Sequence, residues 1–235
     1  MAARRGMKRG RTGNGAPAAK QQRPAYPSGD YRLRGDPRMS TRGLVRRNIP
    51  RETGYVDLAS ASYACDTTGS ITLLATIAQG ASVEQRIGKK VMLKSLQARG
   101  DLRQGTTAVV NDVAFMIVYD KRPGGALPAI TDILESVNPK AMNNDNNASR
   151  FSILKRVDKV LIGDTSSAVD TNSATACDVT FFLPINRHSI FNAAGTGAIG
   201  DIDEGALYLV TVGGTAAGTA AATLTVAFRT RFLDM

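Results

Sequence analysis

The chain has 235 residues, 43% of them hydrophobic, and a formal net charge of +10 at pH 7. This length fits one all-β domain with an additional segment and excludes two large domains. The positive excess indicates a polyanionic partner, such as nucleic acid or an anionic membrane surface. No apolar run approaches the ~20 residues of a bilayer span, and no hydrophobic stretch follows the N-terminal charges, so we expect neither secretion nor membrane insertion.

The charge is concentrated in the first fifth of the chain. Residues 1–51 contain 14 of the 30 Lys and Arg residues and two acids, a net 14 − 2 = +12, whereas residues 52–235 carry 16 − 18 = −2. The segment is rich in Arg, Gly and Pro and has almost no large aliphatic residue before Leu33, so it cannot bury enough apolar surface to offset its ordering entropy. We predict a disordered basic arm over residues 1–51 and one folded domain over residues 52–235.

The arm is the strongest functional signal. Arginine outnumbers lysine there by 12 to 2, and a guanidinium group donates to phosphate oxygens in a planar fork. Phosphate neutralisation releases counterions, so we expect binding that is largely independent of sequence and steeply salt-sensitive. Tyr26 and Tyr31 are available to stack on unpaired bases, which favours single strands. The predicted nucleic-acid-binding residues are Arg4, Arg5, Lys8, Arg9, Arg11, Lys20, Arg23, Arg32, Arg34, Arg38, Arg42, Arg46, Arg47 and Arg51.

Two other interpretations of the arm remain open. It is also suited to be a solubilising or targeting tail, and its first basic cluster is a candidate nuclear-localisation signal read by the host import machinery. That cluster consists of Arg4, Arg5, Lys8, Arg9 and Arg11. Membrane attachment is disfavoured, because the arm has neither an apolar face nor a lipid anchor.

After Glu52, β-branched and aliphatic runs alternate with Gly, Asn, Asp, Pro and Thr clusters, a pattern typical of many strands and short turns. We predict eight strands: Ser70–Ala78, Lys89–Leu102, Asp112–Tyr119, Phe151–Ile162, Ala176–Ile185, a short one at Ser189–Asn192, Ala206–Val212 and Ala222–Phe232.

Details of the pattern add four local predictions. The alternation changes phase between Leu93 and Leu96, which predicts a β-bulge. Asp112–Tyr119 is apolar on both faces and so is a central strand. The last strand has one face in the core and one solvent-exposed face, which contains Thr223, Thr225, Arg229 and Arg231. Residues 213–222 form a flexible hairpin loop between the last two strands.

Helical signals are weak. Residues 130–137 fit one or two turns with Thr131 as N-cap, too short for a βαβ crossover. The longest loop, about 30 residues from Asp120 to Arg150, is long enough to be functional or interfacial. The expected fold is therefore all-β, a two-sheet sandwich or jelly roll.

Catalytic and metal-binding patterns are scarce. His188 is the only histidine and is expected at the surface or in a loop, and residues 195–200 match GxGxxG outside a βαβ unit. The acids Asp201, Asp203 and Glu204 suggest a solvated turn, with calcium between subunits as the alternative. Two cysteines without a CxxC motif provide too few zinc ligands. We interpret them as buried free thiols, with a disulfide between them as the alternative. We expect no cofactor, no metal and no enzymatic activity.

Three stretches, in matching order and spacing, resemble capsid proteins of circular Rep-encoding single-stranded DNA viruses, on the geminivirus and genomovirus side of that group. They are residues 87–96 (IGKKVMLKSL), 115–128 (FMIVYDKRPGGALP) and 147–156 (NASRFSILKR). The resemblance implies a single eight-stranded jelly roll and an icosahedral shell, isometric or twinned, of about 60 or more copies that packages circular single-stranded DNA. It also implies location in the virion and assembly in the host nucleus.

The chain lacks the zinc-finger-like Cys and His cluster of some geminivirus capsid proteins, which favours a looser relative over the twinned particle. RNA is the competing cargo, because similar jelly rolls coat small RNA viruses. Outside the capsid interpretation, a cellular nucleic-acid-binding β protein and a jelly-roll enzyme are the alternatives.

Overall fold

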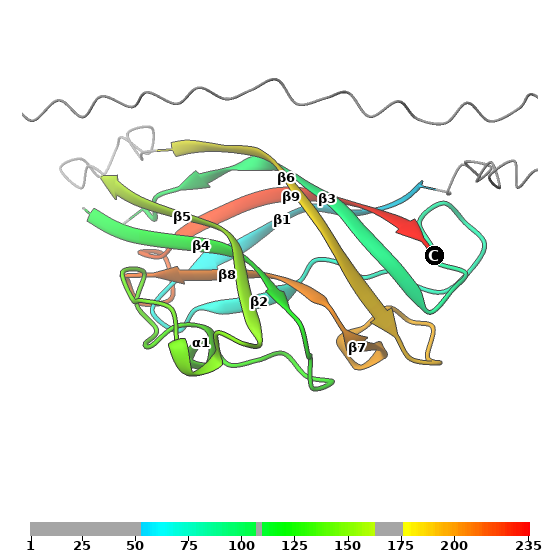
Figure 1. Ribbon diagram of the computed structural model, residues 1–235. Helices are drawn as coiled ribbons and strands as arrows, with labels where there is room; N and C mark the ends of the chain where they lie inside the picture. The colour runs from blue at the N-terminus through cyan, green and yellow to red at the C-terminus, as the bar shows by residue number, and fades with distance from the viewer. Residues whose placement is uncertain (1–52, 107–109, 163–175) are drawn as a thin grey trace, which may run out of the picture. The chain divides into compact units, whose positions relative to one another are not determined.

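The computed structural model describes residues 53–106, 110–162 and 176–235. Within these residues the chain folds into two antiparallel sheets (Figure 1). The first sheet has the order β1 (Thr53–Cys65), β9 (Ala222–Asp234), β3 (Lys90–Arg103), β6 (Ala176–Phe191), β7 (Ile202–Glu204). The second has the order β2 (Ser70–Leu73), β8 (Ala206–Gly213), β4 (Val110–Asp120), β5 (Phe151–Ile162).

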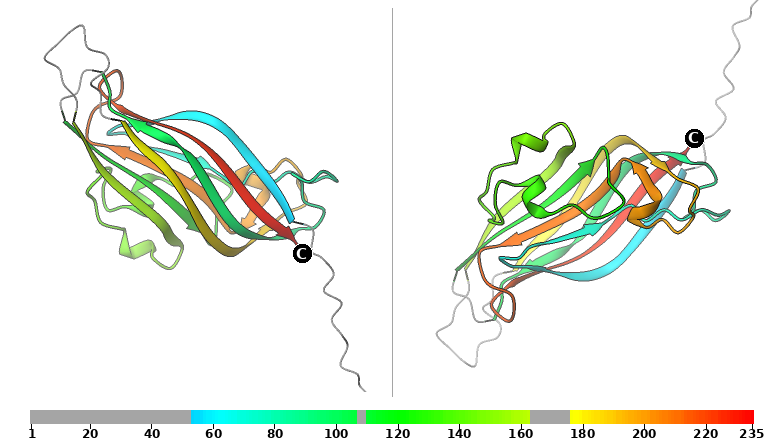
Figure 2. Two further views of the ribbon diagram at one scale, coloured as in Figure 1. Left: turned by 90° about the horizontal axis from the view of Figure 1, so that it is seen from above. Right: turned by 90° about the horizontal axis from the view of Figure 1, so that it is seen from below.

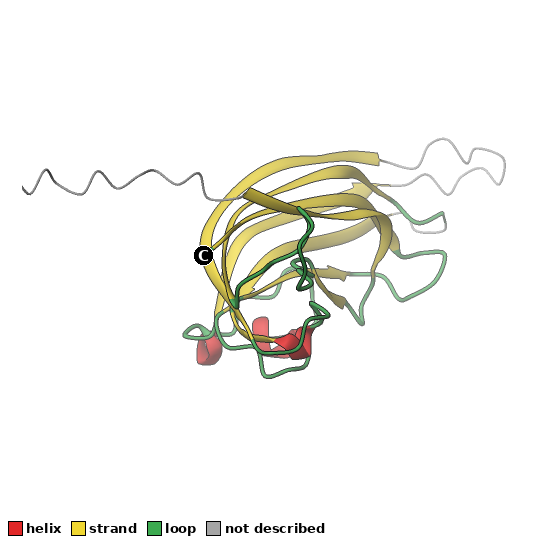
Figure 3. Cartoon of the chain, turned by 90° about the vertical axis from the view of Figure 1, so that its right-hand side faces the viewer, coloured by secondary structure: helices red, strands yellow, loops and turns green. Residues whose placement is uncertain are grey.

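The strand order is that of a jelly roll. Leaving aside the three-residue edge strand β7, the pairs are nested: β1 with β9, β2 with β8, β3 with β6 and β4 with β5. Such nesting rolls one long antiparallel ribbon into two facing sheets, the double Greek key of the jelly roll. In Figure 3 the strands curl around a common interior. The predicted all-β, eight-stranded jelly roll is confirmed.

Several strand assignments were wrong in detail. The short strand expected at residues 189–192 is the end of β6, and the first predicted strand ends at Leu73 instead of Ala78. β1 and β7 were missed. β1 has small side chains at its centre and a register shift between Leu58 and Ala61, so its sequence alternates poorly, and β7 is too short to show a period.

The local predictions had mixed outcomes. The bulge lies at Lys94, between paired residues Leu93 and Ser95. β4 is a central strand, and β9 alternates between buried and more exposed residues along most of its length.

The hairpin prediction was wrong, because β8 and β9 belong to different sheets. The N-cap prediction was also wrong: α1 is a single turn, Ile130–Ile133, capped at Ala129, whose N–H donates to Asp132 Oδ2 at 2.9 Å.

The outward side of the second sheet is covered. All eight residues of β8 are buried, including the outward-facing Tyr208 and Val210. The covering element is the long β4–β5 connection, which contains α1 and buries Ile130 and Ile133. Figure 2 shows this connection, in green, beside the strands. We call the outward side of β8 and β4 the covered face.

The covering loop packs closely against the backbone of Gly69. Gly69 has a φ of +66°, which favours glycine, and a Cβ added there would lie 2.2 Å from Ile130 Cδ1. The Ile130 side chain thus occupies the space that any other residue at position 69 would need.

An ion pair joins the two ends of this loop. Arg150 donates from Nε and Nη2 to the two carboxylate oxygens of Asp120, at 3.0 and 2.8 Å, and its guanidinium stacks on Phe151. The Asp120 side chain is fully buried, whereas that of Arg150 is 32% exposed. Hydrogen bonding to Asp120 raises the pKa of Arg150. The pair therefore fixes the strand ends from which the cover departs.

Candidate nucleic-acid interface

All fourteen basic residues predicted to bind nucleic acid precede residue 53 and lie outside the described residues. The same holds for the nuclear-localisation candidates and for the predicted disorder of the arm. Their roles therefore stay predictions. The described domain does present a second set of basic residues, on the outward side of the first sheet.

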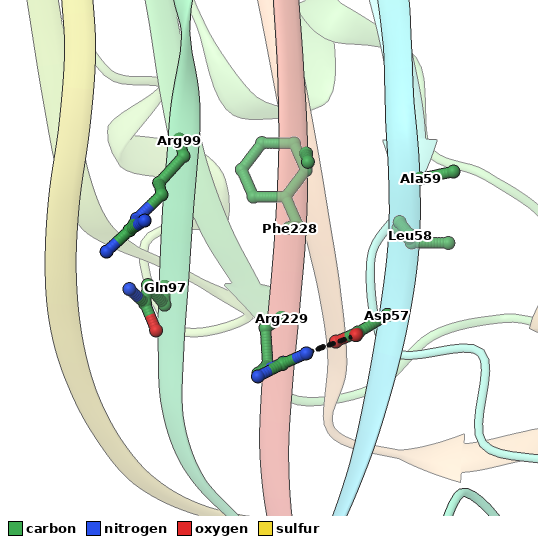
Figure 4. Close-up of a pocket in the computed structure, with 8 residues that line it drawn as sticks. Asp57, Leu58, Ala59, Gln97, Arg99, Phe228 and Arg229 are labelled. Atoms are coloured by element: carbon green, nitrogen blue, oxygen red, sulfur yellow. Dashed lines mark hydrogen bonds and ion pairs between the residues drawn. The ribbon is translucent and has the colours of Figure 1, made fainter.

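That side, formed by β1, β9, β3 and β6, is called the open face here. Register places one row of side chains across all four strands, in the order Asp57, Arg229, Gln97, Phe182. Asp57, Arg229 and Phe182 are exposed, as expected for an outward row, and Phe182 is 60% exposed. Figure 4 shows the first three of these side chains on their strands.

The acid in this row is already paired. Arg229 donates from Nε and Nη2 to Asp57 at 2.7 and 2.6 Å, and its guanidinium lies over the Tyr55 ring at 4.8 Å from the centroid. The hydrogen bond from Arg229 lowers the pKa of Asp57. On the same face Asp101 is bound by Arg103.

Two arginines of the open face remain available. Arg99 and Arg231 are exposed, and neither guanidinium group makes a hydrogen bond or ion pair with another described residue. Register places Arg99 beside Ala227 on β9, one outward row from Arg229, with Arg231 one outward row away on the other side. Figure 4 shows Arg99 and Gln97 along β3, with the Arg99 guanidinium directed toward β6.

A hollow lies next to these residues. It has a volume of about 440 Å³ and is lined by Asp57, Leu58, Ala59, Gln97, Arg99, Ala227, Phe228 and Arg229. The lining includes Leu58 and Ala59, where the register of β1 shifts against β9. The irregular strand thus leaves one edge of the open face uneven, beside its arginines.

The four strands that form the open face carry a positive excess when both sides of the sheet are counted. They contain seven Lys and Arg residues and four Asp residues, 7 − 4 = +3, although residues 52–235 as a whole carry −2. Sequence reasoning recognised Arg229 and Arg231 only as a wet strand face and did not single out Gln97, Arg99 or Phe182. The alternation within each strand shows which of its residues point outward. It does not show which residues of neighbouring strands lie side by side.

The acidic loop before β8 has a structural role. Asp201 is buried, and its Oδ2 accepts from Thr196 N, Thr196 Oγ1 and Gly197 N at 2.8, 2.6 and 2.8 Å. The Thr196 hydroxyl bond lowers the pKa of Asp201. The GxGxxG match thus wraps this carboxylate, and Asp203 and Glu204 are exposed on β7. The solvated turn expected for all three acids was wrong for Asp201.

The remaining candidates for chemistry are dispersed. His188 is exposed, as predicted, but lies within β6 and not in a loop. Both cysteines are free; Cys65 is fully buried, and burial raises its pKa to about 12, whereas Cys177 is only half-buried. No group of three or more potential metal ligands occurs among residues 53–106, 110–162 and 176–235. Within the same ranges, no helix has the length and apolar character of a membrane span.

The strand order limits the class of protein, because jelly rolls of this order form viral capsid and lectin domains. The model of the geminivirus coat protein/nuclear export factor BR1 family matches residues 4–234, so the chain belongs to that family. This confirms the resemblance seen in the sequence.

Similar proteins include the capsid protein of Miscanthus streak virus (isolate 91), 33% identical over 162 residues, which are 61% of this chain and 63% of that protein. The capsid protein of Tomato yellow leaf curl Sardinia virus is 22% identical over 136 residues, 53% of this chain and 50% of that protein. The chain thus spans between half and 63% of the length of these relatives. The match to a solved structure of Desmodium yellow mottle tymovirus covers 96% of this chain and 94% of the tymovirus chain, with 12% sequence identity and a TM-score of 0.30. Because this score is low, the fold assignment rests on the strand order and not on this match.

Proposed function

We propose that the protein is a coat protein that assembles into an icosahedral shell and packages a circular single-stranded DNA genome through its basic segment, residues 1–51. Family membership and the jelly-roll order support the coat role. The observation that carries the packaging role is the separation of charge, +12 in residues 1–51 against −2 in the rest. A near-neutral domain can contact its copies while a cationic segment neutralises phosphate.

The proposed mechanism divides the work between these two parts. Lateral contacts between jelly-roll domains, repeated around symmetry axes, close the shell. Each copy contributes a segment of charge +12, so about 60 copies bring roughly 60 × 12 = 720 positive charges, enough to neutralise about that many phosphates. A longer genome requires more copies, other cations or incomplete neutralisation.

Neutralising the segment tests this proposal. All fourteen basic residues are changed to Gln in the full chain, and purified particles are compared for protein-to-nucleic-acid ratio and nuclease-protected DNA. We expect loss of most of the packaged DNA, because the counterion release that drives binding is removed. A matched control changes the twelve arginines to Lys, which keeps the charge and should retain most packaging. Unchanged packaging in the Gln variant would contradict the proposal.

The same particles distinguish the competing cargo and the competing class. DNase and RNase digestion of the extracted nucleic acid identifies DNA or RNA. A protein that stays small after nuclease treatment would be a binding module and not a shell subunit, an outcome relevant here because the family description also names a nuclear export factor.

Nuclear assembly is the second part of the proposal, carried by the first basic cluster. Changing Arg4, Arg5, Lys8, Arg9 and Arg11 to Ala in a fluorescent fusion of the full chain should reduce nuclear accumulation, because import receptors bind such cationic runs. Changing five basic residues later in the segment, Arg34, Arg38, Arg42, Arg46 and Arg47, is the matched control. Equal loss in both variants would contradict a localised signal.

A further inference from the structure

We infer that the open face is a second binding site for single-stranded DNA, where Arg99 and Arg231 contact phosphates and Phe182 stacks on a base. The inference rests on the proposed function and adds a site on the folded domain to the one proposed for residues 1–51. It depends on three observations: which face is accessible, which charges on it are unpaired, and where an exposed aromatic ring lies.

Accessibility separates the two sheets. The outward side of β8 and β4 is occupied by the β4–β5 loop, and Met116, Val118, Tyr208 and Val210 are fully buried there. On the open face the outward residues of β9 and β3 include exposed Arg229, Arg231 and Arg99. Of these two faces, only the open one leaves the central strands accessible to a long, flexible ligand.

The charges of the open face favour an anion. Asp57 and Asp101 are neutralised by Arg229 and Arg103, and the exposed Asp178 beside Asp101 makes no ion pair with a described residue. The guanidinium groups of Arg99 and Arg231 make no ion pair or hydrogen bond with a described residue, and Arg231 acts on Asp57 only through its longer-range charge. The register positions of Arg99 and Arg231 are four residues apart along β9 and one strand apart across the sheet, about 14 Å between backbones. Arg229 lies between them. The face thus presents two available guanidinium groups on a diagonal suited to a phosphate backbone.

The aromatic ring favours an unpaired base. Phe182 pairs with Gln97 and is therefore the diagonal neighbour of Arg99, which pairs with Thr180, at a separation of about 7–8 Å. The Phe182 side chain is 60% exposed, and the Arg99 guanidinium is directed toward β6, the strand that contains Phe182. Sites for single-stranded nucleic acid combine a basic track with aromatic rings on which bases stack. Gln97, between Arg229 and Phe182, adds an amide able to hydrogen-bond a base edge.

Photocrosslinking of the full chain tests the location. A deoxythymidine oligonucleotide carrying 5-iododeoxyuridine is bound, irradiated and mapped by mass spectrometry. We expect crosslinks in the β6 peptide that contains Phe182, and their loss in the F182L variant and in the double variant R99Q/R231Q. The control R122Q/K159Q removes two exposed charges from the β4–β5 loop and β5 and should keep the crosslinks.

Salt dependence of oligonucleotide binding tests the contacts. Each phosphate contact to a single strand contributes about 0.7 to the slope of log K against log salt, so R99Q/R231Q should lower the slope by about 1.4. R122Q/K159Q should leave it unchanged, and circular dichroism verifies that each variant is folded.

The outcomes separate the two proposals. Crosslinks confined to residues 1–51, with an unchanged slope in R99Q/R231Q, overturn the second site and leave the packaging proposal standing. Absence of DNA binding by the full chain overturns both. If R99Q/R231Q prevents particle formation but keeps the crosslinks and the slope, the open face is a contact between copies and the inference is wrong.

Discussion

The two sheets of the domain each contribute four strands to the jelly roll, but their outward sides differ in composition and in what lies against them. β8 and β4 turn apolar and aromatic residues outward and are buried beneath the β4–β5 loop. β9 and β3 turn Arg, Gln and Thr outward and remain open. Each face also has one Arg–Asp pair with two hydrogen bonds, at Asp120 and at Asp57. Among the described residues, the chain's own loop thus covers one sheet, whereas the outward side of the other sheet is exposed.

The largest expected difference lies between these two ion pairs. Arg150→Met leaves the fully buried Asp120 carboxylate without its guanidinium and should lower the free energy of unfolding by about 3–5 kcal/mol. Arg229→Met is the matched control: both partners of its pair are more than 40% exposed, and the loss should be about 0–1 kcal/mol. Urea unfolding of the unassembled chain measures both. Similar losses would mean that the two faces do not differ in this way.

Truncating one apolar side chain on each face tests the same difference in burial. Ile133→Ala removes a buried side chain from the cover and should cost about 2–3 kcal/mol, in the lower part of the usual range because a loop can partly close the cavity. Phe182→Ala on the open face should change stability by less than about 0.5 kcal/mol, since its ring is mostly in water. Thermal unfolding of both variants provides the comparison, and a large loss for Phe182→Ala would show that its ring is packed.

The smallest effect concerns the titration of the open face. The Arg229 hydrogen bond lowers the pKa of Asp57 below its ordinary value of 3.8, so the charged carboxylate stabilises the fold above that pH. This contribution is lost as pH falls through the lower folded pKa, and solvent exposure keeps it small. A carboxyl-carbon NMR titration should place the Asp57 pKa below 3.8 in the native chain and near it in Arg229→Met. An identical pKa in both would contradict this role for Arg229.

Sequence pattern by itself determined the fold class, because alternation, apolar runs and turn residues are local properties. The phase change between Leu93 and Leu96 predicted the bulge that the structure places at Lys94, and the two apolar faces of β4 predicted a central strand. The same reasoning missed β1, whose small, bulged centre hides its period, and misjudged residues 213–222, since nothing local shows that β8 and β9 belong to different sheets.

Charge segregation is also a property of sequence alone, and it carries the functional proposal for residues 1–51. Only the tertiary structure decided which strands became neighbours, that a loop covers one sheet, and that Arg99, Arg231 and Phe182 share an open face. The physical reason is that these residues are separated by tens of positions in the chain and meet only through strand register. Burial of Tyr208 and exposure of Phe182 likewise follow from what packs against each strand, which no local pattern contains.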